Sequence, residues 1–266
     1  MEEIFNKLYQ MKSLNKEEAF NLFNLVNKKK LNDIQLAVIL ILMKIKGESI
    51  NEILGAIQSF TKYKKHFPIS NKYIFSDITG TGGDKSNGMN ISTISALVAA
   101  SCGFKISKHC NYTITGKIGS SNFLEKLGIN LHLSAVEAQK NLDYLNICFL
   151  LAPLYYKGFK FSTKVRKTLR TRTIFNLIGP LLNPSKPTLT VIGVYKKNFM
   201  LPMAKVLKKL KYQRAILIHS KNNDEITLSG HNDVVELKNN QILSYQLYPK
   251  DFGLNICSRS HFLCNT

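Results

Sequence analysis

The segment of residues 77–93 has the residue types and spacing best suited to chemistry. It reads Asp-Ile-Thr-Gly-Thr-Gly-Gly-Asp-Lys-Ser-Asn-Gly-Met-Asn-Ile-Ser-Thr and joins a predicted strand to a predicted helix. Its glycines Gly80, Gly82 and Gly83 leave backbone N–H groups and a helix N-terminus open, an arrangement that favours a phosphate or a pyrophosphate. The pattern lacks the Gly-Lys-Ser/Thr ending of a P-loop and does not fit the GxGxxG dinucleotide fingerprint. An isolated glycine-rich loop is more often a tight turn than a ligand site. The neighbouring residues must therefore show which of the two this loop is.

Polar residues follow at places that a parallel sheet would bring to the same edge. The next predicted helix opens with residues that cap helices and can also bind a phosphate or a metal, namely Asn90, Ser92 and Thr93. Lys108, His109 and Asn111 follow the next predicted strand, and parallel strands deliver the residues after them to one crevice. A cation and an amide in that crevice suit an anionic ligand.

Two adjacent carboxylates, Asp224 and Glu225, come soon after a later predicted strand that ends at His219. An Asp-Glu pair by itself is usually part of a solvated turn. In a site that is already rich in phosphate donors, the pair is best suited to binding Mg²⁺, which prefers oxygen ligands.

The first 66 residues predict an all-helical unit that precedes the glycine-rich segment. Three pairs with capping-box spacing, Asn15 with Glu18, Asn32 with Gln35 and Ser49 with Glu52, each precede apolar residues at helical spacing. They predict helices near residues 2–10, 16–28, 33–46 and 50–64.

After Pro68 the pattern changes to short β-branched or aromatic runs that alternate with helical stretches. Strands are expected at residues 73–78, 105–107, 147–151, 189–194 and 215–219, and helices at 92–102, 121–127, 135–145 and 198–210. Such alternation predicts an α/β unit with a mostly parallel sheet covered by helices. Residues 234–247, interrupted at Asn239-Asn240, predict an antiparallel hairpin.

The charge of the chain invites comparison with nucleic-acid-binding proteins. Lys and Arg number 37 against 17 Asp and Glu, which gives a net charge of +20. Only five of these residues are Arg, the side chain that base and phosphate recognition favours, and the Lys residues are spread along the chain beside 25 Asn. A solvated basic surface therefore fits better than a nucleic-acid-binding one.

The remaining composition points to a soluble cytoplasmic protein that does not enter a membrane. The five Cys form no CxxC pair, which argues against a zinc ribbon and a disulfide scaffold. The longest apolar run, residues 36–43, is far shorter than the roughly 20 residues that a spanning helix needs. The first residues are acidic, whereas a signal peptide begins with basic ones.

On its clustered motifs, the chain resembles the anthranilate phosphoribosyltransferase family from residue 1 to about residue 254. The motifs are Gly-Thr-Gly-Gly-Asp at 80–84, Asn-Ile-Ser-Thr at 90–93, Lys-His-x-Asn at 108–111 and Arg-Thr-x-Phe-Asn-x-x-Gly-Pro-Leu-x-Asn-Pro at 172–184. The resemblance implies a small helical domain, here residues 1–68, against a larger α/β domain, here residues 69–266. It also implies that part of residues 165–185 packs with the helical domain, and that two copies form a homodimer.

The activity implied by the resemblance is transfer of a phosphoribosyl group from phosphoribosyl pyrophosphate to the amine of anthranilate, with Mg²⁺ as cofactor. The residues implied to bind phosphoribosyl pyrophosphate are Gly80, Gly83, Asp84, Gly88, Asn90, Ile91, Ser92, Thr93, Lys108, His109, Asn111, Thr113, Thr115, Gly116 and Ser120. Those implied for anthranilate are Gly80, Asn111 and Arg166, with Arg166 facing the carboxylate, and those implied for Mg²⁺ are Ser92, Asp224 and Glu225. No side chain is expected to act as a covalent nucleophile.

The chain departs from the family pattern at several positions. Gly88 and Gly116 each stand where the family has a hydroxyl residue. Tyr112 stands where the family has a cation, and Asn122 where it commonly has an Asp. Residues 255–266 are expected to match nothing in the family, so the sequence predicts a C-terminally truncated copy whose α/β domain is incomplete.

Other functions stay open at this point. The chain could be an inactive remnant that acts at most as a binding partner, or a nucleoside phosphorylase, whose architecture is similar. Arg166 and the motif at 172–184 favour the transferase over the phosphorylase.

Overall fold

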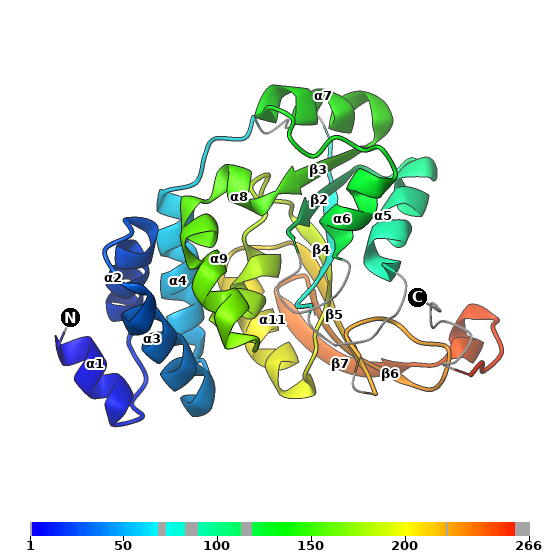
Figure 1. Ribbon diagram of the computed structural model, residues 1–266. Helices are drawn as coiled ribbons and strands as arrows, with labels where there is room; N and C mark the ends of the chain where they lie inside the picture. Colours follow the sequence, from blue (N-terminus) through cyan, green and yellow to red (C-terminus); the bar gives the residue numbers. More distant parts are fainter. Residues whose placement is uncertain (1, 69–72, 83–89, 113–118, 222, 259–266) are drawn as a thin grey trace.

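A mixed sheet forms the centre of the computed structural model (Figure 1). The structure describes residues 2–68, 73–82, 90–112, 119–221 and 223–258. Within these residues the strand order is β3-β2-β1-β4-β5-β6-β7. The strands are β1 (Ser76–Gly80), β2 (Ile106–Cys110), β3 (Ile147–Leu151), β4 (Leu189–Gly193), β5 (Arg214–Ser220), β6 (Asn232–Lys238) and β7 (Gln241–Leu247). Strands β3, β2, β1, β4 and β5 are parallel, whereas β6 and β7 are antiparallel to their neighbours. The predicted α/β architecture with a mostly parallel sheet is confirmed.

The predicted hairpin at 234–247 is also present, as β6 and β7. Asn239 and Asn240, which join the two strands, have φ angles of 49° and 61°. Two-residue hairpin turns of type I′ require positive φ at both central positions, and Asn accepts this conformation more readily than most residues do.

The N-terminal part forms the predicted helices α1 (Glu2–Tyr9), α2 (Lys16–Asn27), α3 (Asp33–Lys46) and α4 (Ile50–Lys62). In α2, α3 and α4 the residues before the helix, Asn15, Asn32 and Ser49, accept a hydrogen bond from the third helical residue, and the capping box closes in each case. Local capping therefore determines where these helices begin.

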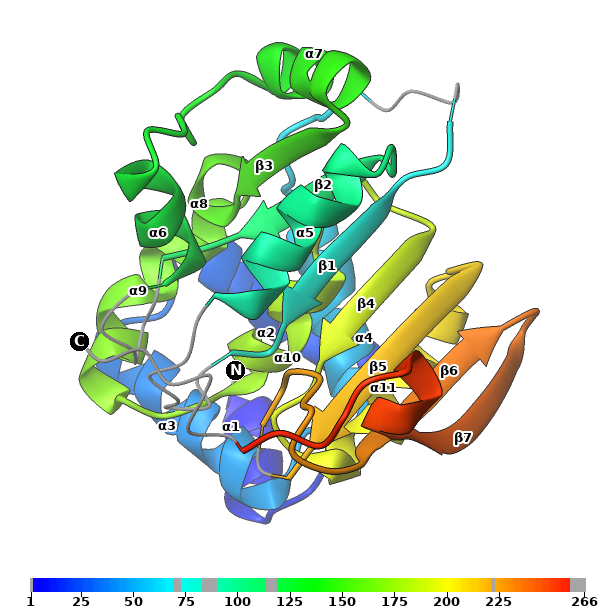
Figure 2. The same cartoon turned by 90° about the vertical axis from the view of Figure 1, so that its right-hand side faces the viewer.

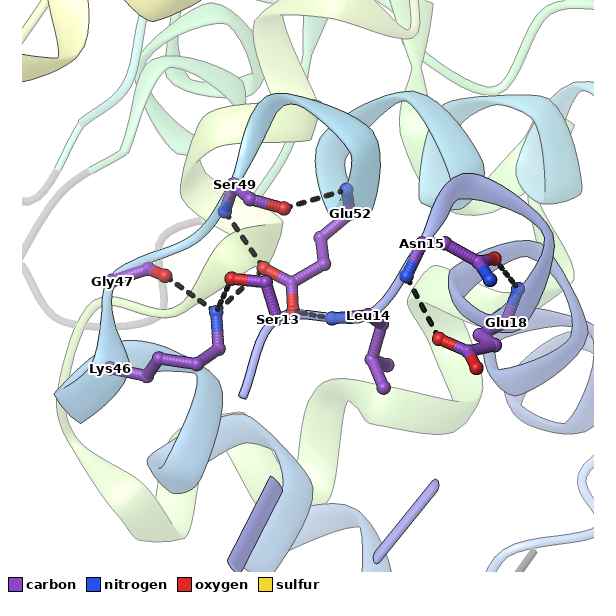
Figure 3. A network of polar contacts seen from close by, with 8 residues as sticks. All are labelled: Ser13, Leu14, Asn15, Glu18, Lys46, Gly47, Ser49 and Glu52. Carbon is purple, nitrogen blue, oxygen red and sulfur yellow. Dashed lines mark hydrogen bonds and ion pairs between the residues drawn. The ribbon is translucent and has the colours of Figure 1, made fainter. Parts of the chain in front are cut away.

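A buried carboxylate on α4 bonds to α3 and to the connection between α1 and α2 (Figure 3). The Glu52 side chain is fully buried, and its Oε1 accepts a hydrogen bond of 2.9 Å from the backbone N–H of Leu14. Its Oε2 accepts bonds of 2.8 Å from Lys46 Nζ and from the backbone N–H of Ser49. Glu52, the third residue of α4, thus also holds the end of α3 and the connection between α1 and α2.

Helices cover both faces of the sheet (Figure 2). Helix α5 (Ile91–Ser101) lies on one face over β1 and β2, whereas α11 (Met200–Lys209) and the N-terminal helices lie on the other. Helices α6 (Ser120–Lys126) and α7 (Ala135–Leu145) follow β2 and lead into β3, and the 3₁₀ turns are η1 (Gly179–Leu181), η2 (Lys197–Phe199) and η3 (Pro249–Phe252). One hydrophobic core runs from the N-terminal helices through α11 to the inner face of the sheet.

Residues 152–178 form helices that the sequence pattern did not indicate: α8 (Ala152–Tyr155), α9 (Lys157–Leu169) and α10 (Ile174–Ile178). Helix α9 packs against α2 and α3 (Figure 1), and α10 packs against α3 and α4. The centroid of the Phe60 ring lies 5.2 Å from that of Phe159 and 5.8 Å from that of Phe175. These rings join the later helices to the N-terminal ones, while the division into domains at residue 68 stays a prediction.

Two predicted strands are displaced toward the C-terminus. Strand β1 begins at Ser76 rather than at residue 73, and β2 runs to Cys110 rather than ending at residue 107. Lys108 and His109 therefore lie inside β2, where the sequence placed them after it. Polar residue types such as Lys108 and His109 do not indicate a buried strand. Both are nevertheless buried here, with Lys108 Nζ bonded to Ile78 O on β1 and His109 Nδ1 bonded to Gly179 O in η1.

Candidate active site

The carboxyl ends of the parallel strands meet where β1 has β2 on one side and β4 on the other (Figure 2). The chain order reverses at β1, and open α/β sheets bind ligands in the crevice at such a point. Strands β1, β2, β4 and β5 end there at Gly80, Cys110, Gly193 and Ser220.

The glycine loop starts at this edge, and its described residues are Thr81 and Gly82. Thr81 N donates to Gly193 O at 2.9 Å, and Thr81 Oγ1 accepts from the Tyr195 backbone N–H at 2.9 Å. Gly82 has a φ of 67°, a conformation that glycine adopts without strain. The loop residues Gly83, Asp84 and Gly88, predicted to bind phosphoribosyl pyrophosphate, lie outside the described residues.

Asp224 lies directly against the start of this loop. Its side chain is buried, and Oδ2 accepts a hydrogen bond of 2.8 Å from Gly82 N. The absence of a side chain at Gly80 makes room for it, since a Cβ atom there would lie 3.2 Å from the same oxygen. Glu225 follows Asp224 in the chain; burial lowers the pKa of Lys108, and the negative charge of Glu225 is among the smaller effects that oppose this shift. The structure thus brings Gly80, Asp224, Glu225 and Lys108 together.

Lys108 is held in the sheet by a network that includes Asp77, a residue to which the sequence pattern gave no role. Its buried Nζ donates to Ile78 O at 2.5 Å. Burial lowers the pKa of Lys108, while the charge of Asp77 on β1 raises it. Burial raises the pKa of Asp77 to about 6, opposed by the charge of Lys108 and by a 2.9 Å hydrogen bond from Asn183 Nδ2.

The predicted helix-start residues lie at the N-termini of α5 and α6. Asn90 precedes α5, and the residues Ile91, Ser92 and Thr93 form its first turn. Thr93 Oγ1 is buried and has no hydrogen-bond partner within the described residues. Ser120 is the first residue of α6, after Gly119.

The loop after β2 is described only in part. Asn111 Oδ1 accepts from the backbone N–H of Tyr112 at 2.8 Å. Tyr112, which replaces the family's cation, donates its hydroxyl to Glu125 at 2.7 Å. The predicted residues Thr113, Thr115 and Gly116 lie outside the described residues.

Arg166 lies on α9 in an aromatic environment. Its side chain is only 6% exposed, and its Cζ lies 4.7 Å from the centroid of the Phe175 ring and 5.9 Å from that of Phe159. Burial lowers the pKa of Arg166 to about 10, so the guanidinium stays charged at neutral pH. Within the described residues, no carboxylate or other acceptor bonds to this buried cation. A buried charge without a partner is costly, which makes this position suited to an anionic ligand.

His109 joins the same aromatic environment from the sheet side. Its ring centroid lies 6.1 Å from that of Tyr156, and Tyr156 in turn contacts Phe159. Nδ1 lies 3.1 Å from Gly179 O, so it carries the proton, while the buried Nε2 has no partner within the described residues. Burial lowers the pKa of His109 to about 4, which keeps the ring neutral at pH 7.

Helix α10 joins Arg166 to Thr81 of the glycine loop. Phe175 lies under the Arg166 guanidinium, and the next residue, Asn176, donates from Nδ2 to Thr81 O at 3.1 Å. Arg172 donates from Nε to Gly82 O at 3.0 Å. Residue types and spacing alone indicated no role for Asn176, Arg172 or Gly193, although the first two lie in the motif at 172–184.

Two cysteines, on β2 and β3, are buried in the sheet. Cys110 and Cys148 are buried, and burial raises the pKa of their thiols to about 11 and about 12. The described residues contain no group of three or more His, Cys, Asp or Glu side chains placed to hold a metal ion. They also contain no helix with the length and apolar character needed to cross a bilayer.

The fold matches two family models: "Glycosyl transferase family, helical bundle domain" over residues 2–62, and "Glycosyl transferase family, a/b domain" over residues 72–264. Fold and site together therefore define a glycosyl transferase of this two-part class. Anthranilate phosphoribosyltransferase from Buchnera aphidicola of Schizaphis graminum is 55% identical over 263 residues, which are 99% of this chain and 78% of the relative. The corresponding protein from Buchnera aphidicola of Acyrthosiphon pisum is 56% identical over 96% of this chain and 75% of the relative. The chain belongs to the anthranilate phosphoribosyltransferase family.

Solved structures agree with this assignment. Anthranilate phosphoribosyltransferase from Thermus thermophilus matches with a TM-score of 0.89 and 30% identity over 97% of this chain and 77% of that chain. The Saccharomyces cerevisiae enzyme, solved in complex with PRPP and Mg, has the same fold, with a TM-score of 0.86, 23% identity and coverage of 98% of this chain and 77% of that chain.

The comparisons correct one expectation about the C-terminal residues. The α/β family model matches through residue 264, and one relative, from Buchnera aphidicola of Schlechtendalia chinensis, aligns over all 266 residues. The expectation that residues 255–266 match nothing in the family is therefore wrong, and the similarity over the whole chain does not support a truncated copy.

Proposed function

We propose that this chain transfers the phosphoribosyl group of phosphoribosyl pyrophosphate to the amine of anthranilate, giving N-(5-phosphoribosyl)anthranilate and pyrophosphate. The observation that carries the proposal is the buried Arg166 guanidinium, which stacks on Phe175 and has no acceptor within the described residues. A planar aromatic acid fits this environment, since its carboxylate would pair with the cation and its ring would pack among aromatic side chains.

The glycine loop edge is assigned to phosphoribosyl pyrophosphate. The unpaired hydroxyl of Thr93 and the N-terminus of α5 favour negative charge at this edge. The residues assigned to this substrate are Gly80, Gly83, Asp84, Gly88, Asn90, Ile91, Ser92, Thr93, Lys108, His109, Asn111, Thr113, Thr115, Gly116 and Ser120. Gly80, Asn111 and Arg166 are assigned to anthranilate.

The acidic pair fits a magnesium ion. Asp224 and Glu225 supply carboxylate oxygens beside the glycine loop, and Mg²⁺ is usually held by one or two carboxylates together with substrate phosphates. Asp224, Glu225 and the hydroxyl of Ser92 would hold it. When bound, the ion would neutralise charge on the pyrophosphate leaving group.

The chain's own residues then act by charge and position. As the bond between the ribose and pyrophosphate breaks, negative charge develops on the leaving group, and Lys108 with the loop N–H groups stabilises it. Arg166 and Asn111 hold the anthranilate amine near the ribose carbon. The neutral His109 keeps an unpaired acceptor at Nε2, which suits an N–H of an aromatic amine. No covalent nucleophile takes part.

The comparisons favour this transferase over an inactive remnant or a nucleoside phosphorylase, because relatives of 50–56% identity carry the transferase name. We also assign the protein to the cytoplasm and to a homodimer formed through its helical part. Exposed apolar side chains on α1 and α3 support the dimer: Tyr9, Ile34 and Ile45 are 60%, 76% and 66% exposed.

The proposed function is tested by the decay of anthranilate fluorescence when the purified 266-residue chain is mixed with phosphoribosyl pyrophosphate and Mg²⁺. We expect a decay that requires the protein and both other components. A double variant, Asp224→Ala with Glu225→Ala, serves as the inactive control. A folded wild-type chain that leaves the fluorescence unchanged would refute the proposal.

A further inference from the structure

The segment of residues 172–183, here called the 172–183 belt, bonds to the glycine loop and to strands β1 and β2 of the proposed site. It contains α10 and η1. Arg172 and Asn176 bond to the glycine loop, whereas Gly179 O accepts from His109 Nδ1 at 3.1 Å. At its far end, Asn183 Nδ2 donates to Asp77 Oδ2 at 2.9 Å and to Ser107 O at 2.7 Å. The belt therefore contacts β1, β2 and the glycine loop along its whole length.

One peptide unit of the glycine loop is held at both of its ends. Asn176 Nδ2 donates to the carbonyl oxygen of Thr81, and the N–H of Gly82 in the same planar unit donates to Asp224 Oδ2. In a trans peptide the C=O and N–H point in opposite directions, so fixing the oxygen also fixes the direction of the N–H. Asn176 thereby turns the Gly82 N–H toward the acidic pair.

Glycine makes this anchoring necessary. Gly82 has no Cβ, and with a φ of 67° its flanking peptide units can rotate at little steric cost. The other hydrogen bonds of Thr81 engage its N–H, which donates to Gly193 O, and its hydroxyl, which accepts from Tyr195 N and donates to Asp224 Oδ2 at 3.5 Å. Without an external donor on Thr81 O, the Thr81–Gly82 unit would lose one of its two fixed ends.

Arg172 strengthens the same anchor from the other side. Its Nε donates to Gly82 O, and its guanidinium carbon lies 4.1 Å from the centroid of the Tyr195 ring. The Tyr195 backbone N–H in turn donates to Thr81 Oγ1. Meanwhile Phe175 packs edge-to-face on Phe60 of the N-terminal helices, which anchors the belt in the core.

We propose that Asn176 and Arg172 are positioning residues that orient the Thr81–Gly82 peptide for phosphoribosyl pyrophosphate. They act through the loop backbone. The proposal rests on the proposed function for the identity of the substrate, whereas the orientation of the peptide can be measured without any turnover.

The test uses Asn176→Asp. The carboxylate still accepts the helix-capping bond from Thr173 N, which Asn176 Oδ1 accepts at 3.1 Å, but it has no N–H to donate to Thr81 O. The control is Asn32→Asp, which makes the same amide-to-carboxylate change at an exposed residue whose Oδ1 caps α3 by accepting from the backbone N–H of Gln35. A second pair is Arg172→Lys, which removes the Nε–H donor and keeps the charge, with the exposed Arg170→Lys as its control.

Two readouts are measured for each variant: the KM and kcat of the transferase, and hydrogen exchange of a peptide that contains Gly82. We expect Asn176→Asp to raise the KM for phosphoribosyl pyrophosphate by about three- to ten-fold, with little change in the KM for anthranilate. Exchange at Gly82 should become faster in Asn176→Asp than in Asn32→Asp, at similar melting temperatures. Arg172→Lys should likewise have a higher KM for phosphoribosyl pyrophosphate and faster exchange at Gly82 than Arg170→Lys.

An unchanged KM for phosphoribosyl pyrophosphate, or exchange at Gly82 that matches the control, would overturn the positioning role. Faster exchange throughout the chain with a lower melting temperature would also overturn it, because that result marks a general loss of stability. If the wild-type chain has no transferase activity, the proposed function fails, and the exchange measurement alone then decides whether the belt orients the loop.

Discussion

Gly193 and Asp224 are in closer contact than any side chain at residue 193 would allow, since a Cβ atom there would lie 1.6 Å from the backbone oxygen of Asp224. Gly193 is paired with Gly80 across β4 and β1, and both glycines lie under the acidic loop. Because Gly80 and Gly193 have no side chains, these two strand ends, here called the glycine floor, leave room for Asp224 to approach Gly82. This contact explains a glycine at the end of a buried strand, where glycine otherwise weakens the strand.

Replacing Gly193 should therefore displace the acidic pair. In Gly193→Ala the new methyl group overlaps backbone atoms of Asp224, which cannot rotate away as a flexible side chain would. We expect the Mg²⁺ concentration that supports half-maximal activity to rise at least ten-fold, together with a loss of about 2 kcal/mol in the free energy of unfolding. Gly230→Ala is the control, since a Cβ atom there meets nothing within 4 Å. Equal Mg²⁺ requirements in the two variants would contradict the role of the glycine floor.

Loss of the Arg166 cation should affect anthranilate selectively. Arg166→Gln removes the charge but keeps a polar side chain over Phe175, so the KM for anthranilate should rise by about ten-fold or more, with a small change in the KM for phosphoribosyl pyrophosphate. The assay is the fluorescence decay at varied anthranilate. Arg170→Gln on the exposed end of the same helix serves as the control. A uniform rise in both KM values would show that Arg166 is structural.

The buried His109 should make the fold sensitive to mild acid. Its pKa is about 4 in the folded protein and 6.5 in a model peptide, so between these values the unfolded chain binds more protons and the free energy of unfolding falls as pH falls. Asp77 acts in the opposite sense between pH 6 and 3.8, because its pKa of about 6 is raised from 3.8 and the folded chain binds the proton.

The variant His109→Gln separates these two contributions. Relative to this variant, the wild-type chain should lose up to about 3 kcal/mol between pH 6.5 and 4, whereas the contribution of Asp77 is common to both proteins and cancels. Urea unfolding at several pH values measures the difference, and His132→Gln, at a side chain that is 60% exposed, is the control. Parallel stability curves for wild type and His109→Gln would show that His109 is protonated equally in both states.

The Lys46–Glu52 ion pair in Figure 3 should be important for stability. Lys46 Nζ lies 2.8 Å from Glu52 Oε2, and the two side chains are 6% and 0% exposed. Lys46→Met would leave a buried carboxylate without its cation, so we expect a loss of about 3 kcal/mol in the free energy of unfolding. Lys164→Met removes the exposed pair with Asp33, whose side chains are 82% and 56% exposed, and should cost less than about 1 kcal/mol. Chemical denaturation of both variants gives the comparison.

Elements with local signals could be predicted from the sequence. The capping boxes at Asn15, Asn32, Ser49 and Ser134 are all present, because each depends on residues three positions apart. Strand β3 and the Asn239-Asn240 turn also lie where the pattern placed them. The glycine loop follows a strand and precedes a helix, as its composition indicated.

Features that depend on distant partners could not be predicted in this way. Lys108 looked like a residue of a loop, yet it lies within a buried strand because Asp77 and a carbonyl oxygen on β1 satisfy its charge. Helices α8 and α9 have no side-chain hydrogen bond at the residue before the helix, and α9 packs closely on Phe60 only because Gly158 has no side chain at the contact.

The sequence by itself determined the family, the class of substrate at the glycine loop and the starts of the helices, since these depend on residue types at short spacing. Only the tertiary structure decided that Arg166 stays unpaired among aromatic rings, that Gly193 makes room for Asp224, and that the 172–183 belt bonds to the glycine loop. Each of these relationships joins residues from separate elements. Their physical cause is packing around the strand ends, which short-range patterns do not encode.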